Sequence, residues 1–392
     1  MAERILSPTE RRLALLSVIG AISVVGMQIG LFMPLLSLVL EAKGVSPFLI
    51  GLNAAFGSSA VAIFAPFVPA VVRRLGSARF MLGCFVLAVA CVLLLRIFDN
   101  VWAWFPIRFA FNMGIVGLFI ASEAWIGALA DERSRGRIVG LYAACLGGGF
   151  ALGPALLSVT GSAGWPPFLS GAAIMAAGSL PLLAAWRFAP VMPGRAAFSA
   201  LGFLRVAPTL ALAVLVFGLI ETTAYSLLAI QGMRLGQSEV FATRALSLFA
   251  VGAIILQLPI GWLADRINRY LVLILCAAAT LAGPLALPHL SEAPIAWLAV
   301  IFLWGGLATG LYTVALTIVG ERFRGADLVA ANAALGMLYG LGAMIGPALG
   351  GAAMQLWPGR GLMGTLALAA FLVLATALLR RSWQHAGGQK MP

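Results

Sequence analysis

Long hydrophobic runs, separated by short polar segments, follow one another along the whole chain. Each run holds 18 or more residues, enough for an α-helix to cross roughly 30 Å of hydrocarbon. Because lipid offers no partner to an unpaired backbone amide, such runs must be helical. The pattern predicts twelve spans, at residues 13–40, 48–72, 80–97, 101–129, 138–160, 167–187, 208–232, 240–264, 270–288, 295–320, 328–356 and 362–379.

Composition agrees with an integral membrane protein. Of 392 residues, 62% are hydrophobic and 10% are charged, whereas roughly 25% of a soluble domain is charged. The net charge of +12 does not predict nucleic-acid binding, because the basic residues are spread over short segments between the runs. All four cysteines fall inside hydrophobic runs, which is typical of small packing residues rather than metal ligands. We expect an all-α membrane protein without cofactor or metal.

The distribution of positive charge predicts the orientation. If both termini are cytoplasmic, the segments on that side hold 19 of the 25 Lys and Arg residues, as the positive-inside rule requires. The first ten residues are polar and carry no cleavage pattern, so the first span is expected to be retained. We predict a multi-pass protein of the cell membrane, in particular the bacterial inner membrane, with both termini in the cytoplasm.

The chain divides into two similar halves. The longest connection, residues 188–207, separates six spans from six and carries Pro and Gly residues. "DERSRGRIVGLYAACLGGGFALGPAL" around the fifth span matches "GERFRGADLVAANAALGMLYGLGAMIGPALGG" around the eleventh. We predict two pseudo-symmetric six-helix bundles, residues 1–187 and 208–392, joined by a cytoplasmic linker. Such repeats are typical of transporters that alternate between two openings around a mid-membrane site.

Three motifs make the chain resemble the major facilitator superfamily (MFS) over nearly its whole length. "GWLADRINRY", Gly261 to Tyr270, is similar to that superfamily's loop signature, with Asn268 in place of a glycine. "RFAFNMGIVG", from Arg108, is similar to a fourth-span motif, and "GGGFALGPAL", from Gly147, to a fifth-span motif. Phrases such as "LQLPIGWLADRINRYLVL" most resemble the YcaD-like branch.

The resemblance implies roles for several residues. In the superfamily, the aspartate of the loop signature helps to close the inward gate, the fourth-span arginine is linked to proton coupling, and the fifth-span motif is associated with antiporters. In the first half, "PAVVRRLGSAR" has Arg73 where the aspartate is expected, so its charge partners are rearranged. The gate candidates are Asp265, Arg266, Arg269, Arg73 and Arg74. The helix-packing candidates are Gly149, Gly153, Pro154, Gly346 and Pro347.

Glu221 is the carboxylate that the sequence makes most conspicuous. The nearest charged residues are Arg205 and Arg234, and Glu221 falls in the middle of its span. A charge at the bilayer centre costs about 2.5–3.5 kcal/mol on insertion scales, so such residues usually have a function. Burial favours the neutral form, which lets a carboxyl group carry a proton and release it on hydration. The alternative is a structural carboxylate held by a hydroxyl or by Arg244.

Other polar residues within spans are weaker candidates. Arg108, seven residues into the fourth span, can anchor an anion or influence a nearby acid, or it can reach the outer interface. Glu123 fits a gate, packing or proton-carrying role equally well. The candidates for proton coupling are Glu221, Arg108 and Glu123. The candidates for substrate binding are Gln28, Asn112, Glu221, Thr222, Tyr225, Arg244 and Tyr339.

These features favour a secondary transporter over an enzyme. No lysine stands in a Walker A context, and two histidines, His289 and His385, cannot build a metal centre or a catalytic triad. We predict proton-coupled efflux of amphiphilic compounds by a protein that is a monomer in the lipid bilayer. The alternative is proton-coupled uptake of a small organic anion or zwitterion, anchored by Arg108 or Arg244. A non-transporting receptor or a lipid-handling protein is a remote alternative.

Overall fold

The protein is helical throughout the part of the chain that its computed structural model describes, which is residues 7–129, 135–186, 207–290 and 292–386. Twelve of the helical segments in these ranges are long and apolar enough to cross a membrane, and they match the twelve predicted spans. The predicted linker, residues 188–207, lies outside the described residues except for Ala207. The described helices are α1 (Pro8–Ala42), α2 (Pro47–Phe64), η1 (Ala65–Phe67), α3 (Val68–Leu75), α4 (Ser77–Ile97), α5 (Val101–Leu129), α6 (Arg135–Thr160), α7 (Pro166–Ala184), α9 (Pro208–Arg234), α10 (Glu239–Ile255), α11 (Gln257–Arg266), α12 (Arg269–Ala286), η3 (Leu287–His289), α13 (Pro294–Arg322), α14 (Gly325–Leu356) and α15 (Gly361–Ala386).

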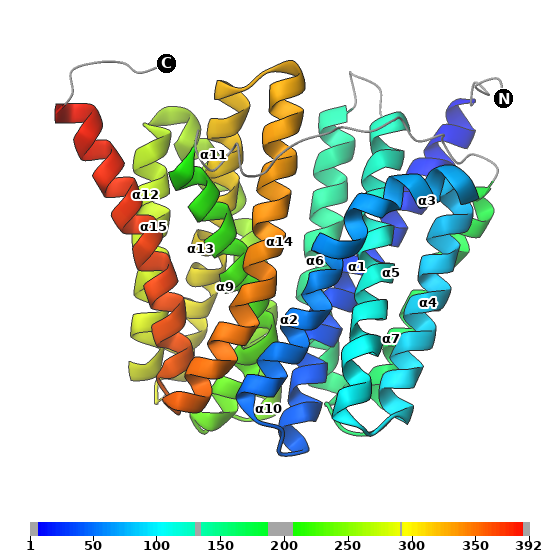
Figure 1. Cartoon of the computed structure of the whole chain (residues 1–392), viewed down its shortest axis with the longest axis horizontal. Helices are drawn as coiled ribbons and strands as arrows, with labels where there is room; N and C mark the ends of the chain where they lie inside the picture. The colour runs from blue at the N-terminus through cyan, green and yellow to red at the C-terminus, as the bar shows by residue number, and fades with distance from the viewer. Residues whose placement is uncertain (1–6, 130–134, 187–206, 291, 387–392) are drawn as a thin grey trace. The chain divides into compact units, whose positions relative to one another are not determined.

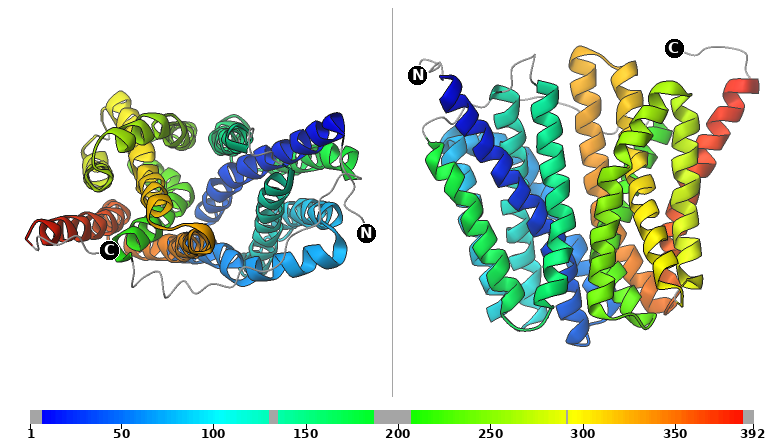
Figure 2. Two further views of the ribbon diagram at one scale, coloured as in Figure 1. Left: turned by 90° about the horizontal axis from the view of Figure 1, so that it is seen from above. Right: turned by 180° about the vertical axis from the view of Figure 1, so that it is seen from behind.

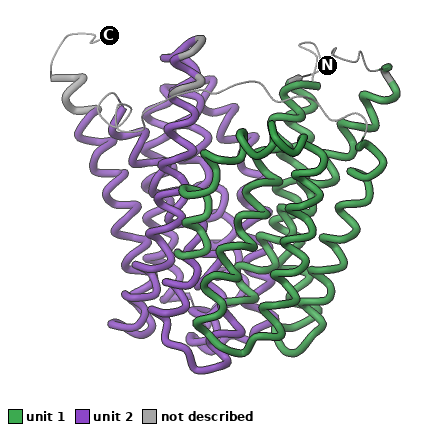
Figure 3. Tube along the Cα trace, turned by 45° about the vertical axis from the view of Figure 1, so that its right-hand side comes forward, with its two compact units in different colours: residues 1–36, 56–195 green, residues 37–55, 196–392 purple. Residues whose placement is uncertain are grey.

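The chain forms two compact units, which Figure 3 draws in different colours. Unit 1 comprises residues 1–36 and 56–195, and unit 2 comprises residues 37–55 and 196–392. The last residues of α1 and the first of α2 therefore belong to unit 2. Seen from above, some helices are viewed nearly end-on, whereas α1 and α15 are tilted and run obliquely across the view (Figure 2).

Two spans are interrupted where proline removes backbone donors. The second span consists of α2, η1 and α3, and its short 3-10 turn contains Pro66 and is followed by Pro69. The eighth span consists of α10 and α11, which meet at Leu256, and Pro259 follows in the first turn of α11. Proline lacks an N–H group and clashes with the preceding turn, so a helix commonly bends or restarts at such positions.

Helix α9 is the central helix of unit 2. It packs against α10, α13, α14 and α15. Of its most hydrophobic stretch of 18 residues, 89% are buried, more than in any other of the described spans. A side chain in the middle of α9 therefore has protein neighbours on most sides.

Candidate transport site

Glu221 lies near the middle of α9 and meets a hydroxyl group from another helix. Its Oε2 atom accepts a hydrogen bond of 2.6 Å from the Tyr339 hydroxyl on α14, and both side chains are half-buried. This length is within the range of a charge-assisted O–H···O⁻ bond. The structure therefore gives the intramembrane carboxylate a donor that stabilises its ionised form.

Glycines bring α9 and α14 close enough for this bond. A Cβ atom on Gly342 would overlap the carbonyl oxygen of Leu215, and one on Gly218 would overlap the carbonyl oxygen of Tyr339. A Cβ on Gly346 would lie 2.5 Å from the carbonyl oxygen of Leu219. Small residues at a helix crossing allow the two backbones to touch. Tyr339 consequently lies beside Gly218, one turn before Glu221.

Three aromatic rings cluster together, and one of them is the ring of Tyr339. The ring centroids of Phe217 and Tyr312 lie 5.5 Å apart, those of Phe217 and Tyr339 5.8 Å, and those of Tyr312 and Tyr339 6.5 Å. Phe217 is buried, whereas Tyr312 and Tyr339 are half-buried. The rings come from α9, α13 and α14, so the cluster joins three helices of unit 2.

The other α9 candidates make contacts that hold the helices together. The Thr222 hydroxyl lies 2.7 Å from the Gly218 carbonyl and 3.3 Å from the Ala343 carbonyl on α14. Tyr225 is 2% exposed, and its ring meets that of Phe249 edge-on at 5.9 Å. A substrate contact by Thr222 or Tyr225 stays a prediction.

Arg108 on α5 is a buried charged residue of unit 1. Arg108 is only 3% exposed, and its carbonyl accepts a 2.9 Å bond from Asn112 Nδ2. A Cβ atom on Gly57 of α2 would come within 2.9 Å of Arg108 Cγ and 2.7 Å of Asn112 Nδ2. Both candidates are thus packed against a neighbouring helix, and Arg108 does not occupy an open membrane-facing position.

Gln28 and Glu123 lie in different surroundings. Gln28 is fully buried and its Nε2 donates to the Gly171 carbonyl of α7 at 2.6 Å, which is an interhelical bond. Glu123 is an exposed residue on α5 near Tyr142, whose hydroxyl lies 3.3 Å from Ser122 Oγ. The structure does not bring Gln28, Asn112 or Glu123 into the Glu221 cluster in any described contact.

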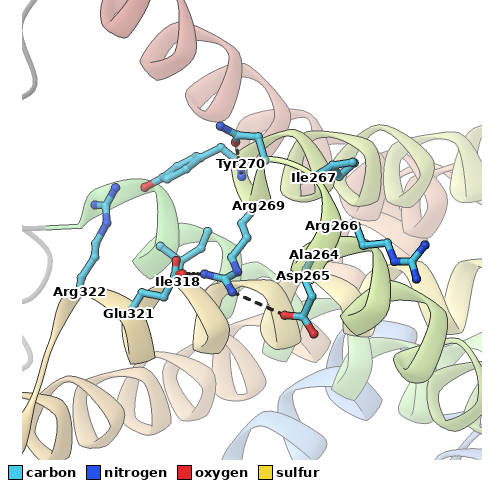
Figure 4. A pocket seen from close by; sticks show the side chains of 10 residues that line it. Ala264, Asp265, Arg266, Ile267, Arg269, Tyr270, Ile318, Glu321 and Arg322 are labelled. Carbon is cyan, nitrogen blue, oxygen red and sulfur yellow. Dashed lines mark hydrogen bonds and ion pairs between the residues drawn. The ribbon is translucent and has the colours of Figure 1, made fainter.

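The loop-signature residues line a polar pocket at the end of α11 and the start of α12. Figure 4 shows Arg269 reaching toward Glu321 and Asp265, while the Arg266 side chain extends away from both. Arg269 pairs with Glu321 of α13 and lies 3.5 Å from Asp265, and the Arg266 guanidinium stacks on Trp262 at 4.0 Å. The pocket has a volume of about 400 Å³.

The remaining charged candidates are exposed. Arg73 and Arg74 lie in the last turn of α3, and Arg244 lies on α10. A further ion pair joins the ends of two helices within unit 2, where Arg234 Nη2 lies 2.8 Å from Glu41 Oε1. We refer to Glu41 and Arg234 as the end pair.

Sequence reasoning missed Phe217, Trp262, Glu321 and the end pair as functional candidates. Phe217 stands one turn before Glu221, and this spacing was the available signal for a shared helix face. The other contacts join distant segments, which a single sequence does not register. Within the described residues, no three His, Cys, Asp or Glu side chains gather as metal ligands would.

Comparison with known proteins agrees with this architecture. The model of the family described as Major Facilitator Superfamily matches residues 18–243 and 210–389. The uncharacterized MFS-type transporter YfkF of Bacillus subtilis is 26% identical over 363 residues, covering 85% of this chain and 87% of that protein. The uncharacterized MFS-type transporter YcaD of Shigella flexneri is 27% identical over 317 residues, covering 79% and 80%.

Solved transporter structures share the fold. The nucleoside transporter NupG superposes with a TM-score of 0.71 at 14% identity, covering 95% of this chain and 98% of NupG. A bacterial homologue of the human lysosomal transporter Spinster gives a TM-score of 0.72, also at 14% identity, covering 95% and 96%. The predicted fold and the resemblance to YcaD are confirmed. The chain is a multi-pass secondary transporter of a small molecule, and it belongs to the Major Facilitator Superfamily.

Proposed function

We propose that the protein exports amphiphilic compounds in exchange for protons and that Glu221 carries the proton. The observation that supports this most directly is the hydrogen bond between Glu221 and Tyr339. It places a titratable group in the middle of a transmembrane helix, next to a hydroxyl that can stabilise its ionised form. An ionisable residue retained at this depth is costly, so a coupling role accounts for its presence.

The mechanism follows from the two states of this carboxylate. When protonated, Glu221 is neutral and is compatible with an empty site in an apolar environment. When ionised, it is stabilised by Tyr339 or by a bound solute. Because a proton and a solute use the same carboxylate, binding of one favours release of the other, which is the requirement for exchange.

The same proposal includes the position of the protein in the membrane. We propose that both termini are cytoplasmic, that the membrane is the bacterial inner membrane and that the protein works as a monomer. Residues 1–187 and 208–392 would be the two moving halves, with residues 188–207 as the linker. Asp265, Arg269 and Glu321 would then form a gate network at the cytoplasmic end, and the end pair would lie at the outer end.

Proton-coupled uptake of an organic anion is the second candidate, and the burial of Arg108 favours it. A buried guanidinium stays charged and can bind a carboxylate in a two-pronged arrangement. In that case Arg108→Gln would remove solute binding, whereas Glu221→Gln would leave it intact.

Transport in proteoliposomes tests the export proposal. Wild type and Glu221→Gln are reconstituted, an inward-acidic pH gradient is imposed, and accumulation of the amphiphilic cation ethidium is followed by fluorescence. We expect the gradient to drive accumulation by wild type and not by Glu221→Gln. Glu292→Gln, the same change at an exposed turn residue, is the matched control and should behave as wild type. Equal proton-driven transport by Glu221→Gln would refute the role of Glu221.

A further inference from the structure

The surroundings of Glu221 are unusually rich in tyrosine. The chain has five tyrosines, and three of them, Tyr225, Tyr312 and Tyr339, interact electrostatically with one another or with Glu221. Tyr312 and Tyr339 also contact Phe217, so rings from three helices cluster together, and one of them, Tyr339, is hydrogen-bonded to the carboxylate. We call Phe217, Tyr312, Tyr339 and Glu221 the aromatic carboxylate site.

This combination of groups matches the chemistry of an organic cation. The face of an aromatic ring is electron-rich and attracts a cation within about 6 Å of its centroid, and a substituted ammonium group is the usual ligand. A carboxylate supplies the opposite charge. None of the described electrostatic partners of Glu221 and Tyr339 is basic, so no described positive charge at the site would attract an anion.

Exposure separates the rings that can touch a ligand from those that cannot. Tyr312 and Tyr339 are half-buried, so part of each ring is accessible, while Phe217 is 5% exposed and packs behind both. Tyr225 is 2% exposed and packs edge-on against Phe249, so it contributes to the packing of unit 2. Tyr312 therefore offers part of its ring, and Tyr339 offers both part of its ring and the hydroxyl that donates to Glu221.

We infer that the aromatic carboxylate site binds the substituted ammonium group of an organic cation, with the cation resting on the Tyr312 and Tyr339 rings and paired with Glu221. The cation takes over the carboxylate oxygen to which the Tyr339 hydroxyl donates in this structure. This inference rests on the proposed function, because it assigns the class of solute to the same carboxylate.

One proton leaves the protonated carboxyl group for each cation bound. The described titratable groups that interact with Glu221 are Tyr339 and Tyr225, and Tyr312 interacts with Tyr339. The other described charged side chains on helices packed against α9 belong to the outer parts of those helices, namely Glu239 and Arg244 on α10, Glu321 and Arg322 on α13, Asp327 on α14 and Arg380 on α15. Glu221 is thus the group that exchanges the proton for the cation.

Binding to the purified full-length protein in nanodiscs tests the inference. The probe is radiolabelled benzyltrimethylammonium, measured by equilibrium dialysis. Its competitors are phenylacetate, an anion, and neopentylbenzene, in which carbon replaces the charged nitrogen. We expect wild type to bind the probe, and neither competitor to displace it at equal concentration. Tyr312→Leu should weaken binding about tenfold, as loss of one desolvated cation–ring contact predicts.

Matched variants distinguish a loss of the ring's contact with the probe from a loss of folding. Tyr312→Phe keeps the ring and should bind as wild type does, and Tyr312→Met covers the case in which Tyr312→Leu does not fold. Phe56→Leu is the control, since Phe56 packs on Phe105 and Phe109 within unit 1. Glu221→Gln should abolish binding of the probe.

The outcomes also separate this inference from the proposed function. Equal binding of probe and neopentylbenzene, or unchanged binding by both Tyr312→Leu and Tyr312→Met, would overturn the assignment of a cationic solute. Proton-driven transport that depends on Glu221 could still be observed with a neutral solute, and the export proposal would then stand. Tight binding of phenylacetate would overturn the cation site and favour uptake of an anion.

Discussion

The crossing of α1 with α6 in unit 1 and that of α9 with α14 in unit 2 are built from equivalent contacts. A Cβ atom on Gly149 would overlap the Ser23 carbonyl, and its counterpart on Gly342 would overlap the Leu215 carbonyl. Gly153 and Met27 repeat the contact of Gly346 with Leu219, at 2.6 Å and 2.5 Å respectively. Gly26 meets the carbonyl of Leu146 as Gly218 meets that of Tyr339. The repeated halves therefore share one backbone crossing.

The side chains beside the two crossings differ in their chemistry. At the positions of Glu221 and Tyr339 in unit 2, unit 1 has Ile29 and Leu146, and all four are half-buried. One half thus carries an apolar pair where the other carries a hydrogen-bonded carboxylate and phenol. The comparison teaches that the glycines determine how the helices meet, whereas the neighbouring pair determines what the half can bind.

The largest expected effect is loss of the folded protein when either helix crossing is widened. Gly342→Leu and Gly149→Leu place a side chain against backbone atoms, so neither variant should yield folded protein, as overpacking at a tight contact predicts. Size-exclusion profiles and melting temperatures measure this. The matched controls are Gly336→Leu and Gly148→Leu on the same helices, where a Cβ has no heavy atom within 4 Å among those compared. If all four variants fold equally, the glycine contacts do not hold the crossings.

Replacing Glu221 and Tyr339 of unit 2 by the apolar residues found at the equivalent positions of unit 1 should abolish transport and keep the fold. The double variant Glu221→Ile/Tyr339→Leu removes the proton carrier together with its partner, so no unsatisfied polar group remains. We expect a melting temperature equal to or above that of wild type and no proton-driven transport in proteoliposomes. Ile29→Glu, which buries a carboxylate without a tyrosine partner, should instead lower stability by about 2 kcal/mol or more. Retained transport in the double variant would contradict the difference between the crossings.

Removing only the Tyr339 hydroxyl should have an intermediate effect. Tyr339→Phe keeps the ring but takes away a bond to a charged group, worth about 1.5 kcal/mol, and we expect about tenfold slower proton-driven transport. Initial rates of ethidium accumulation measure the change. Tyr142→Phe, which removes a hydroxyl from unit 1, is the control. A rate equal to wild type in Tyr339→Phe would mean that the bond to Glu221 does not contribute.

The smallest effect is expected at the end pair, where the final residues of α1 approach α9. Glu41 and Arg234 retain side-chain exposures of 22% and 31%, so the pair should contribute about 1 kcal/mol or less. Arg234→Ala should therefore change transport by no more than about fivefold. A double-mutant cycle with Glu41→Ala measures the interaction, and purely additive effects would show that the two residues are not coupled.

The twelve spans followed from the sequence because hydrophobic length alone determines where a chain can cross a bilayer. Glu221 was identifiable for a related reason, since a lone carboxylate in an apolar run is costly. Tyr339 was among the substrate-binding candidates, but its bond to Glu221 depends on the register of α9 against α14. That register is set by Gly218 and Gly342, and a single sequence shows the glycines without showing what they touch.

Other residues lay beyond sequence reasoning for the same physical reason. Gln28 was a substrate-binding candidate from the sequence, and the structure shows its amide bonded to Gly171 on another helix, while a substrate contact stays a prediction. Arg269 was expected in a gate, but its pairing with Glu321 joins segments 52 positions apart. Polar residues within spans identify themselves by type, while their partners depend on tertiary packing.

The glycine crossings have a consequence for how such a protein can be re-engineered. Because backbone touches backbone there, the adjacent side-chain pair can be exchanged without a new interface having to be designed. Each half offers one such slot, at positions 29 and 146 in one and 221 and 339 in the other. A library restricted to these four positions would explore new solute preferences and driving ions on an unchanged scaffold.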